Sequence, residues 1–448
     1  MIRDLAAGLA LRPATAEDEE ALATFVGDVL RAQDGDDPNQ HLVAWTRDLL
    51  SGRHPGFRPA DATVVVRRDT GAIVSCLHLL TQTWAYGGIP IAMGQPELIG
   101  TLAEHRGAGL VRAQFEVIHR LSAERGQQLL AIAGIPWFYR QFGYEMAIER
   151  GGGPRLSVDV VTVKPQAPAG WRLRPVEDAD VPFLVEVAAT AAGRSLVSVP
   201  RDAALWRYEL AGKRADSAAR REIRIFERDG ERVGYLAHVL ELWGGGLAVT
   251  AFEVKPGASW RVGWLPALPY LFGTGAAMAR PGAPFAAVSF WFLGTRHPLY
   301  SVFRFQHFEA GYAWYVRVPD VAAFLGTVVP ALERRLAASP CAGHSGTLTL
   351  GFYTSGVRIA LERGKLTAIE AWRPDITVRG LEFGRPSIDP RRPLAMFPDL
   401  TFLQLLFGFR ALEELETAFP DCVVRTQEAR ALLNALFPKT PSDVWPVT

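Results

Sequence analysis

Residues 98–144 constrain the fold of this chain more than any other part of its sequence. The segment begins with the short apolar run Leu98-Ile99-Gly100-Thr101 and then passes through two closely spaced glycines, Gly107 and Gly109. After Gly109 the side chains recur at spacings of three and four, which is the period of a helix. The recurring positions are the apolar Leu110, Ala113, Val117, Ile118 and Leu121, with the polar Gln114 among them. The pattern predicts a strand, a glycine-rich turn and a helix in succession.

This turn has the chemistry of an anion site. The first amides of a helix lack intrahelical acceptors, and the helix dipole places partial positive charge at the same end. Gly107 and Gly109 would let the backbone approach a phosphate closely, and Arg106 would add a cation beside it. Taken alone, the motif fits a plain strand-to-helix turn equally well.

The residues after the helix extend the pattern. Residues 127–134 read as a buried strand, and Pro136 then opens a short helical segment that ends at Gly143. Its aromatic residues are Trp137, Phe138, Tyr139 and Phe142. This order of elements resembles the GNAT superfamily of acyl-CoA-dependent N-acetyltransferases, in which an R/Q-x-x-G-x-G/A loop holds the CoA pyrophosphate. Here the loop reads Glu104-His105-Arg106-Gly107-Ala108-Gly109, so glutamate replaces the first residue of the pattern and the backbone amides are unaffected.

The resemblance implies acetyl-CoA as cosubstrate and assigns its contacts. The loop and the first helical turn would hold the pyrophosphate through Arg106, Gly107, Ala108, Gly109, Leu110, Val111 and Arg112. The backbone of Ile99, Gly100 and Thr101 would hold the pantetheine arm where the central strand splays from its neighbour. Gly134 and Ile135 would line the same slot.

An internal repeat predicts a second unit of the same kind. Leu173-Arg174-Pro175 and the acidic residues after it echo Leu11-Arg12-Pro13, 162 residues earlier, and a proline-rich link at 164–169 precedes them. Where a second glycine pair should stand, the chain reads Lys255-Pro256-Gly257-Ala258-Ser259-Trp260. Without paired glycines we expect this unit to be structural.

From residue 318 the pattern changes to a helix, three strands and further helices, which predicts a compact α+β unit. The whole layout resembles the tripartite enhanced-intracellular-survival acetyltransferases, whose third domain has a sterol-carrier-protein-like fold. The predicted fold class is therefore α/β and α+β: tandem GNAT folds, each a mixed central sheet flanked by helices, followed by a sterol-carrier-protein-like domain. The expected domains are a catalytic one at 1–164, a degenerate GNAT-like one at 165–317 and the third at 318–448.

Three residues are candidates for catalysis. By resemblance, Tyr139 would donate a proton to the departing CoA thiolate; the alternative is a core tyrosine. Glu97 could deprotonate the attacking ammonium through water, or be a plain strand-end carboxylate. In the enhanced-intracellular-survival proteins the C-terminal carboxylate enters the active site, and here that group belongs to Thr448.

Composition narrows the class of protein. The formal charge of +1 favours neither nucleic acid nor an anionic membrane as partner. Cys76, Cys341 and Cys422 lie far apart in the sequence. No group of His, Cys or Asp residues has the spacing of metal ligands, so we expect no metal site. The apolar residues 262–294 are interrupted by prolines, so we expect no spanning helix and a cytoplasmic protein. Likeness to the tripartite family suggests a homo-oligomer.

The leading hypothesis is an acetyl-CoA-dependent N-acetyltransferase in which a primary amine attacks the thioester directly. The alternative is a non-catalytic CoA- or lipid-binding protein with a remnant GNAT site. The acceptor stays open among aminoglycosides, polyamines, peptide N-termini and lysine side chains. Two sets of apolar residues could line a ligand site or pack in the core: Trp45, Trp84, Trp137 and Phe138 for an amine, and Phe402, Leu403, Leu405, Leu406 and Phe407 for a lipid.

Overall fold

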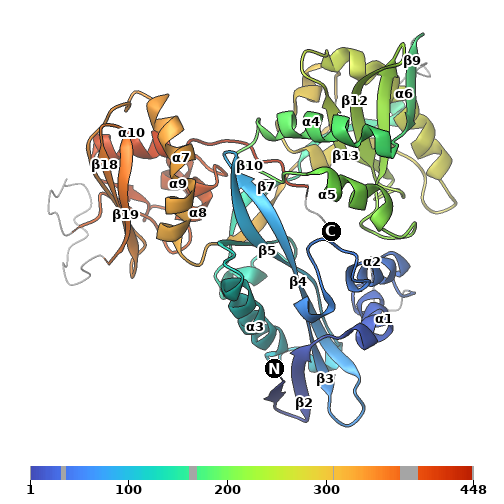
Figure 1. Cartoon of the computed structure of the whole chain (residues 1–448), viewed down its shortest axis with the longest axis horizontal. Helices are drawn as coiled ribbons and strands as arrows, with labels where there is room; N and C mark the ends of the chain where they lie inside the picture. Colours follow the sequence, from blue (N-terminus) through green and yellow to red (C-terminus); the bar gives the residue numbers. More distant parts are fainter. Residues whose placement is uncertain (1, 32–36, 161–168, 306, 374–391, 446–448) are drawn as a thin grey trace.

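The chain folds around three β-sheets, each with its own helices (Figure 1). The computed structural model describes residues 2–31, 37–160, 169–305, 307–373 and 392–445. In the colours of Figure 1 the first group of elements runs from blue to teal, the second from green to yellow, and the third from orange to red. The predicted arrangement of two mixed sheets flanked by helices, followed by a third α+β unit, is confirmed.

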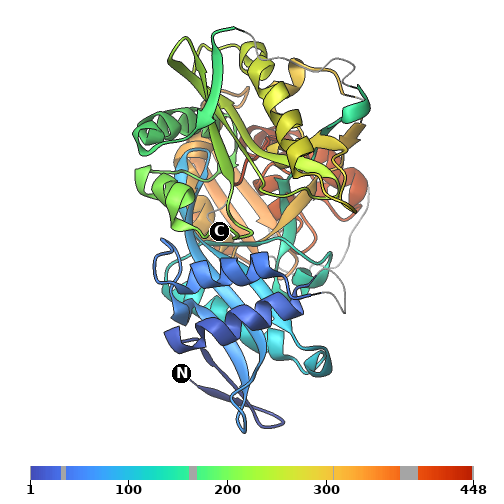
Figure 2. The same cartoon turned by 90° about the vertical axis from the view of Figure 1, so that its right-hand side faces the viewer.

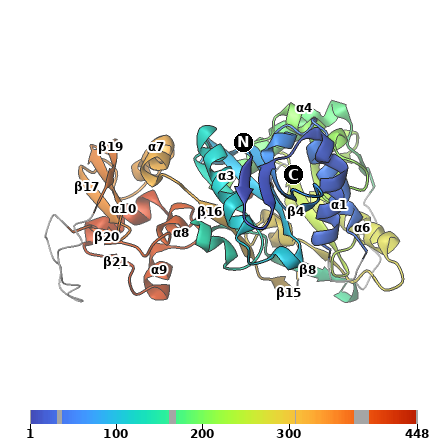
Figure 3. The same cartoon turned by 90° about the horizontal axis from the view of Figure 1, so that it is seen from below.

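The first sheet has the strand order β1-β2-β3-β4-β5-β6-β16-β7. Two long antiparallel strands, β4 (Ile73–Tyr86) and β5 (Ile89–Thr101), form its centre. Figure 2 shows α1 and α2 lying side by side across one face of this sheet, and Figure 3 shows α3 on the side of β4 away from α1. The other elements are β1 (Arg3–Leu5), β2 (Leu9–Pro13), β3 (Ala62–Arg67), β6 (Leu129–Ile132), β7 (Glu145–Arg150), α1 (Glu19–Val29), α2 (Gln40–Leu50) and α3 (Leu110–Glu124).

The second sheet has the order β15-β8-β14-β13-β12-β11-β9. Helix α4 (Val181–Ala192) contacts β13, and α6 (Trp260–Met278) contacts β13 and β14. The strands are β8 (Gly153–Ser157), β9 (Trp171–Pro175), β11 (Glu222–Arg228), β12 (Glu231–His238), β13 (Gly246–Val254), β14 (Ala287–Ser289) and β15 (His307–Glu309).

The first two sheets exchange strands. Strand β8, from the range expected for the first domain, pairs with β14 and β15 in the second sheet. Strand β16 (Tyr312–Arg317), from the range expected for the second domain, lies between β6 and β7 in the first. The short strand β10 (Val197–Ser198) also joins β4. The two units are therefore tied together by backbone hydrogen bonds.

The internal repeat is visible as two equivalent ion pairs. Arg12 donates to both carboxylate oxygens of Asp18 at 2.7 and 2.8 Å, and Arg174 binds Asp180 in the same way at 2.6 and 2.8 Å. Each aspartate also accepts the backbone N–H three residues before it, which starts the helix that follows. The same local structure thus recurs in both units.

The two equivalent ion pairs are expected to differ in how much they contribute to stability. The Asp180 side chain is 1% exposed and also binds Arg232, whereas Asp18 is 13% exposed and has one arginine partner. We expect Asp180→Asn to lower the free energy of unfolding by about 2 kcal/mol, and Asp18→Asn by about half of that, because charged hydrogen bonds contribute more when buried. Calorimetric unfolding of the two variants measures this, and an equal loss would contradict it.

The third sheet, in the order β19-β18-β17-β20-β21, belongs to the C-terminal group. Its elements are α7 (Val321–Ala337), β17 (Gly346–Gly351), β18 (Gly356–Glu362), β19 (Lys365–Trp372), β20 (Ala395–Met396), α8 (Phe402–Leu406), α9 (Leu412–Ala418), β21 (Val423–Val424) and α10 (Gln427–Leu436). No helix in the described parts of the chain combines the length and apolar character needed to span a bilayer.

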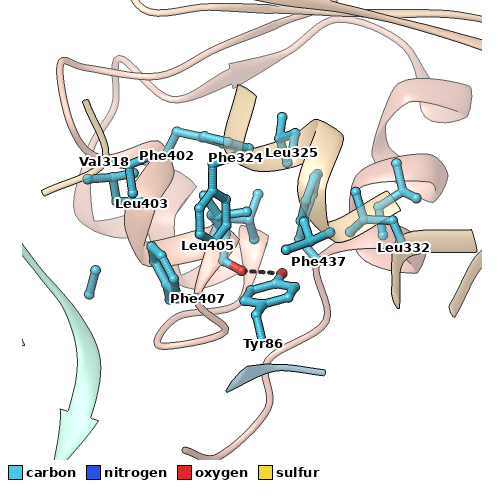
Figure 4. Close-up of a cluster of buried hydrophobic side chains, with 14 of the residues drawn as sticks. Tyr86, Val318, Phe324, Leu325, Leu332, Phe402, Leu403, Leu405, Phe407 and Phe437 are labelled. Atoms are coloured by element: carbon cyan, nitrogen blue, oxygen red, sulfur yellow. Dashed lines mark hydrogen bonds between the residues drawn. The ribbon is translucent and has the colours of Figure 1, made fainter. Parts of the chain in front are cut away.

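This group shares a hydrophobic core with the first sheet. The ring of Tyr86, at the tip of β4, lies among Phe324, Phe407 and neighbouring apolar residues, and its hydroxyl donates to the carbonyl of Leu406 at 2.7 Å (Figure 4). The residues considered for a lipid site, Phe402, Leu403, Leu405, Leu406 and Phe407, are all buried in this core. The core alternative therefore holds for them.

Candidate active site

The glycine-rich turn has the predicted form. After β5 the chain makes one short helical turn, η3 (Ala103–His105), and α3 begins at Leu110. Gly107 and Gly109 adopt φ values of +79° and +76°, which side chains disfavour. Gly109 is the N-cap of α3 and offers no side-chain acceptor, and apart from its chain neighbours no described atom lies within 4 Å of where its Cβ would be. Residues 109–112 also line a cavity, so the start of α3 is accessible to an anion.

Strands β5 and β6 separate before they end. Their parallel pairing is limited to Met93 with Leu129 and Gly94 with Leu130, although β5 continues to Thr101. A register shift on β4 and a positive φ of 46° at Leu98 accompany the separation. Among the described residues, no strand pairs with the β6 side of β5 beyond Gly94. The backbone of residues 99–101 is therefore open on that side.

A cavity of about 700 Å³ occupies this opening. It is within the usual size of a small-molecule site. All the residues predicted to bind the cofactor line this cavity, except Ala108 and Gly134. They are Ile99, Gly100, Thr101, Arg106, Gly107, Gly109, Leu110, Val111, Arg112 and Ile135. Tyr139 lines it as well. Two arginines give it a cationic end, where Arg106 contacts the carbonyl of Thr101 and Arg112 donates to Gln141.

Tyr139 lies at the apolar end of this cavity. It belongs to the short helical turn η4 (Phe138–Phe142) and is 5% exposed. Its hydroxyl has no hydrogen-bond partner among the described residues, and it lies 3.0 Å from where a Cβ of Gly134 would be. Gly134 therefore provides the space for the phenol. Burial, together with the nearby Glu97, raises the pKa of Tyr139 well above its usual range, so the phenol stays protonated.

Glu97 lies close to Tyr139 but does not line the cavity. Its carboxylate is half-buried on β5 and accepts a hydrogen bond from Gln95 at 2.7 Å. Burial raises the pKa of Glu97, and the positive charge of Arg150 on β7 acts in the opposite direction. A raised pKa favours proton uptake by this carboxylate, which suits a general base.

Strand β16 adds two tyrosines that no sequence pattern singled out. The Tyr312 hydroxyl donates to the carbonyl of Gly134 at 2.8 Å, and the Tyr315 hydroxyl accepts the amide of Trp137. The rings of Tyr315 and Tyr139 lie 5.6 Å apart, edge to face. These contacts fix the segment that carries Tyr139. They join residues 178 positions apart, so no local pattern could have indicated them.

The aromatic candidates for an acceptor pocket are dispersed. Trp84 is fully buried in the core shared with the third group, and Trp45 packs against the core under α1 and α2. Phe138 lines the cavity. Trp137, whose φ is +64°, is 64% exposed, and the Arg140 guanidinium lies over its ring. Of these four aromatic residues, only Phe138 therefore lines the cavity.

Thr448 lies outside the described residues. The described part of the C-terminal segment runs beside β10, where Asp443 donates its amide to the carbonyl of Val197 at 2.9 Å. Trp445 packs edge to face against Trp206, with the Arg201 guanidinium 4.1 Å from its ring centroid. Within the described residues, no group of three or more His, Cys, Asp or Glu side chains is arranged to hold a metal ion.

Comparisons with known proteins agree with this geometry. Residues 10–147 match the family model described as an acetyltransferase (GNAT) domain. No curated protein matches significantly. Among solved structures, a GCN5-related N-acetyltransferase from Anabaena variabilis is 14% identical, with a TM-score of 0.62 over 98% of this chain and 99% of that one. A GCN5-related N-acetyltransferase from Kribbella flavida is 17% identical, with a TM-score of 0.59 over 97% of each chain.

A further solved structure, Eis1 from Mycobacterium abscessus, is 14% identical, with a TM-score of 0.57 over 98% of this chain and 99% of that one. At such identities the likeness of the three structures concerns the fold, which they share with this chain along nearly its whole length. The family match adds the chemistry. Residues 10–147 therefore match a GNAT acetyltransferase domain, which supports an acyltransferase, and a domain of this kind implies acetyl-CoA as the acyl donor.

Proposed function

We propose that this protein transfers the acetyl group of acetyl-CoA to a primary amine by direct attack, with Tyr139 as general acid. One observation carries the proposal: the glycine turn, the open backbone of β5 and the phenol of Tyr139, which has no hydrogen-bond partner among the described residues, line a single cavity. An anion-binding end and a protonated donor in one cavity match the two ends of a CoA thioester.

The cofactor contacts follow from the cavity lining. The amides of residues 109–112 would bind the pyrophosphate, with Arg106 and Arg112 adding positive charge. The open backbone of Ile99–Thr101 would hold the pantetheine arm, and one free amide there would polarise the thioester carbonyl. These contacts would place the sulfur beside Tyr139.

The chemical step balances in atoms and protons. The substrate ammonium first gives one proton through water to Glu97, which is close enough to Tyr139 to influence its pKa. The neutral amine nitrogen then attacks the thioester carbonyl, the carbon–sulfur bond breaks, the thiolate takes the proton of the Tyr139 hydroxyl, and the nitrogen releases its second proton to solvent. Proton return from Glu97 to Tyr139 through solvent completes the cycle.

The proposal includes the organisation of the chain. A catalytic unit at 1–164, a structural unit at 165–317 and a sterol-carrier-protein-like unit at 318–448 would make up a tripartite protein, with β8 and β16 exchanged between the first two. Three separate sheets and the whole-length likeness to Eis1 support this division. A cytoplasmic homo-oligomer is part of the same proposal, and the resemblance to the tripartite family supports it.

A CoA-release assay with a panel of amines tests the activity. The panel should include a polyamine, an aminoglycoside, a peptide with a free N-terminus and a lysine-containing peptide blocked at its terminus. Release of CoA with at least one amine, and mass-spectrometric detection of its acetyl amide, is the expected result. If no amine is acetylated and calorimetry shows a lipid binding where CoA does not, the carrier alternative replaces the proposal.

A further inference from the structure

A chain of buried hydrogen bonds leads to Glu97 through the middle of the first sheet. The indole N–H of Trp84 donates to Oε1 of Gln82 at 3.0 Å, and Nε2 of Gln82 donates to Oε1 of Gln95 at 2.8 Å. Nε2 of Gln95 then donates to Oε2 of Glu97 at 2.7 Å. Trp84, Gln82 and Gln95 are all buried, so water does not compete for these bonds.

The donors and acceptors along this series of hydrogen bonds can be arranged in one way only. An indole N–H donates and never accepts, so it fixes the oxygen of Gln82 toward Trp84 and the amide nitrogen of Gln82 toward Gln95. The same reasoning fixes the amide of Gln95, which must present its nitrogen to Glu97. The end of the chain is therefore an N–H donor, and the group it suits is an ionised carboxylate.

The other groups around Glu97 leave Gln95 a distinct role. Arg150 on β7 favours the charged carboxylate, and Tyr139 on η4 faces it as a neutral phenol. His78 on β4 is the cross-strand partner of Glu97, but its ring contacts the carbonyl of Leu98. The amide of Leu98 reaches Glu97 at 3.3 Å. Among the described residues, Gln95 is the only side chain that hydrogen-bonds to this carboxylate.

We propose that Gln95 is a positioning residue that keeps Glu97 ionised and fixed for proton uptake, and that Gln82 and Trp84 set the direction of its amide. This inference rests on the proposed role of Glu97 as general base. Burial alone would leave the carboxylate protonated over a wider range of pH, and the donated hydrogen bond from Gln95 opposes that effect.

The test is the pH dependence of kcat/KM with one amine for all variants. Gln95→Met keeps the length of the side chain and removes the donor. We expect the acid limb of the profile to move up by about one pH unit, which is the loss of one charge-assisted hydrogen bond. Trp84→Phe allows the side-chain amides of Gln82 and Gln95 to flip, so we expect the acid limb to shift in the same direction by a smaller amount.

Gln127→Met is the matched control. Gln127 is a buried glutamine in the same sheet region that donates to the hydroxyl of Thr81 at 3.0 Å, and among the described residues no hydrogen bond joins it to Glu97. The acid limb of the pH profile should not shift in the Gln127→Met variant. If Gln95→Met lowers kcat/KM by the same factor at every pH, the role of Gln95 is merely structural and the inference is overturned.

Glu97→Gln separates this inference from the proposed function. Loss of the acid limb in Glu97→Gln, together with its shift in Gln95→Met, supports both. Loss of the limb in Glu97→Gln with no shift in Gln95→Met overturns only the role of Gln95. An acid limb that persists in Glu97→Gln shows that Glu97 is not the base, so the inference fails, while turnover of the amine still supports the acetyltransferase activity.

Discussion

Replacing Tyr139 by phenylalanine is expected to lower kcat by about 100-fold or more, which is the usual contribution of a general acid. The phenol has no competing hydrogen-bond partner in the described structure and its pKa is raised, so it is held as a proton donor inside the cavity. The phenylalanine ring keeps the contacts with Phe115 and Tyr315. We therefore expect little change in the KM for acetyl-CoA, measured in the same steady-state assay.

Tyr144→Phe provides the control for this prediction. Tyr144 is a buried tyrosine in the same aromatic cluster, but its hydroxyl bonds to Nε2 of His119 at 3.0 Å and it does not line the cavity. Its loss should affect stability and leave kcat within a few-fold. Equal losses of kcat in the two variants would point to a general effect of the cluster and contradict the acid role of Tyr139.

The sequence predicted the elements whose signals are local. The glycine turn and α3 were found because helical spacing and paired glycines lie within a short stretch. Extents were less accurate. A strand was expected at 127–134, but β6 covers Leu129–Ile132, because its partners β5 and β16 determine where pairing ends.

The order of strands could not be predicted, because it depends on contacts between distant residues. The insertion of β16 between β6 and β7 places Tyr312 and Tyr315 beside the segment of Tyr139. The same applies to the third group, whose core takes in Tyr86 from the tip of β4. No periodicity within β16 or β4 indicates either partner.

The site shows the same division between local and distant signals. Tyr139 and the loop residues could be selected from a motif, and they line one cavity. The hydrogen-bond chain from Trp84 to Glu97 was missed, although its members alternate along β4 and β5. A glutamine inside an apolar strand was the available signal, since a buried amide must find partners. To predict that Gln82 and Gln95 contact each other, one would have needed the register of β4 against β5.

Gly109→Val is expected to weaken CoA binding about 100-fold. A β-branched residue disfavours the φ of +76° at this N-cap, so the backbone of the turn must change. The first N–H groups of α3 then no longer point toward the pyrophosphate. Losing about two charge-assisted hydrogen bonds to the pyrophosphate costs about 3 kcal/mol of binding free energy, which is about 100-fold in Kd. Isothermal titration calorimetry with CoA measures the change.

Gly126→Val tests whether that loss is specific to the anion-binding turn. Gly126 follows the other end of α3, has a φ of +64°, and has no atom within 4 Å of its Cβ position. The substitution imposes the same kind of backbone strain away from the cavity, so stability should fall while the Kd for CoA stays within about two-fold of the wild-type value. If Gly126→Val weakens CoA binding as much as Gly109→Val, strain spreads along α3 and the amides of residues 109–112 are not the specific anion site. A loss confined to Gly109→Val would tie affinity to the amides at this turn, because the two substitutions differ mainly in which end of the helix they disturb.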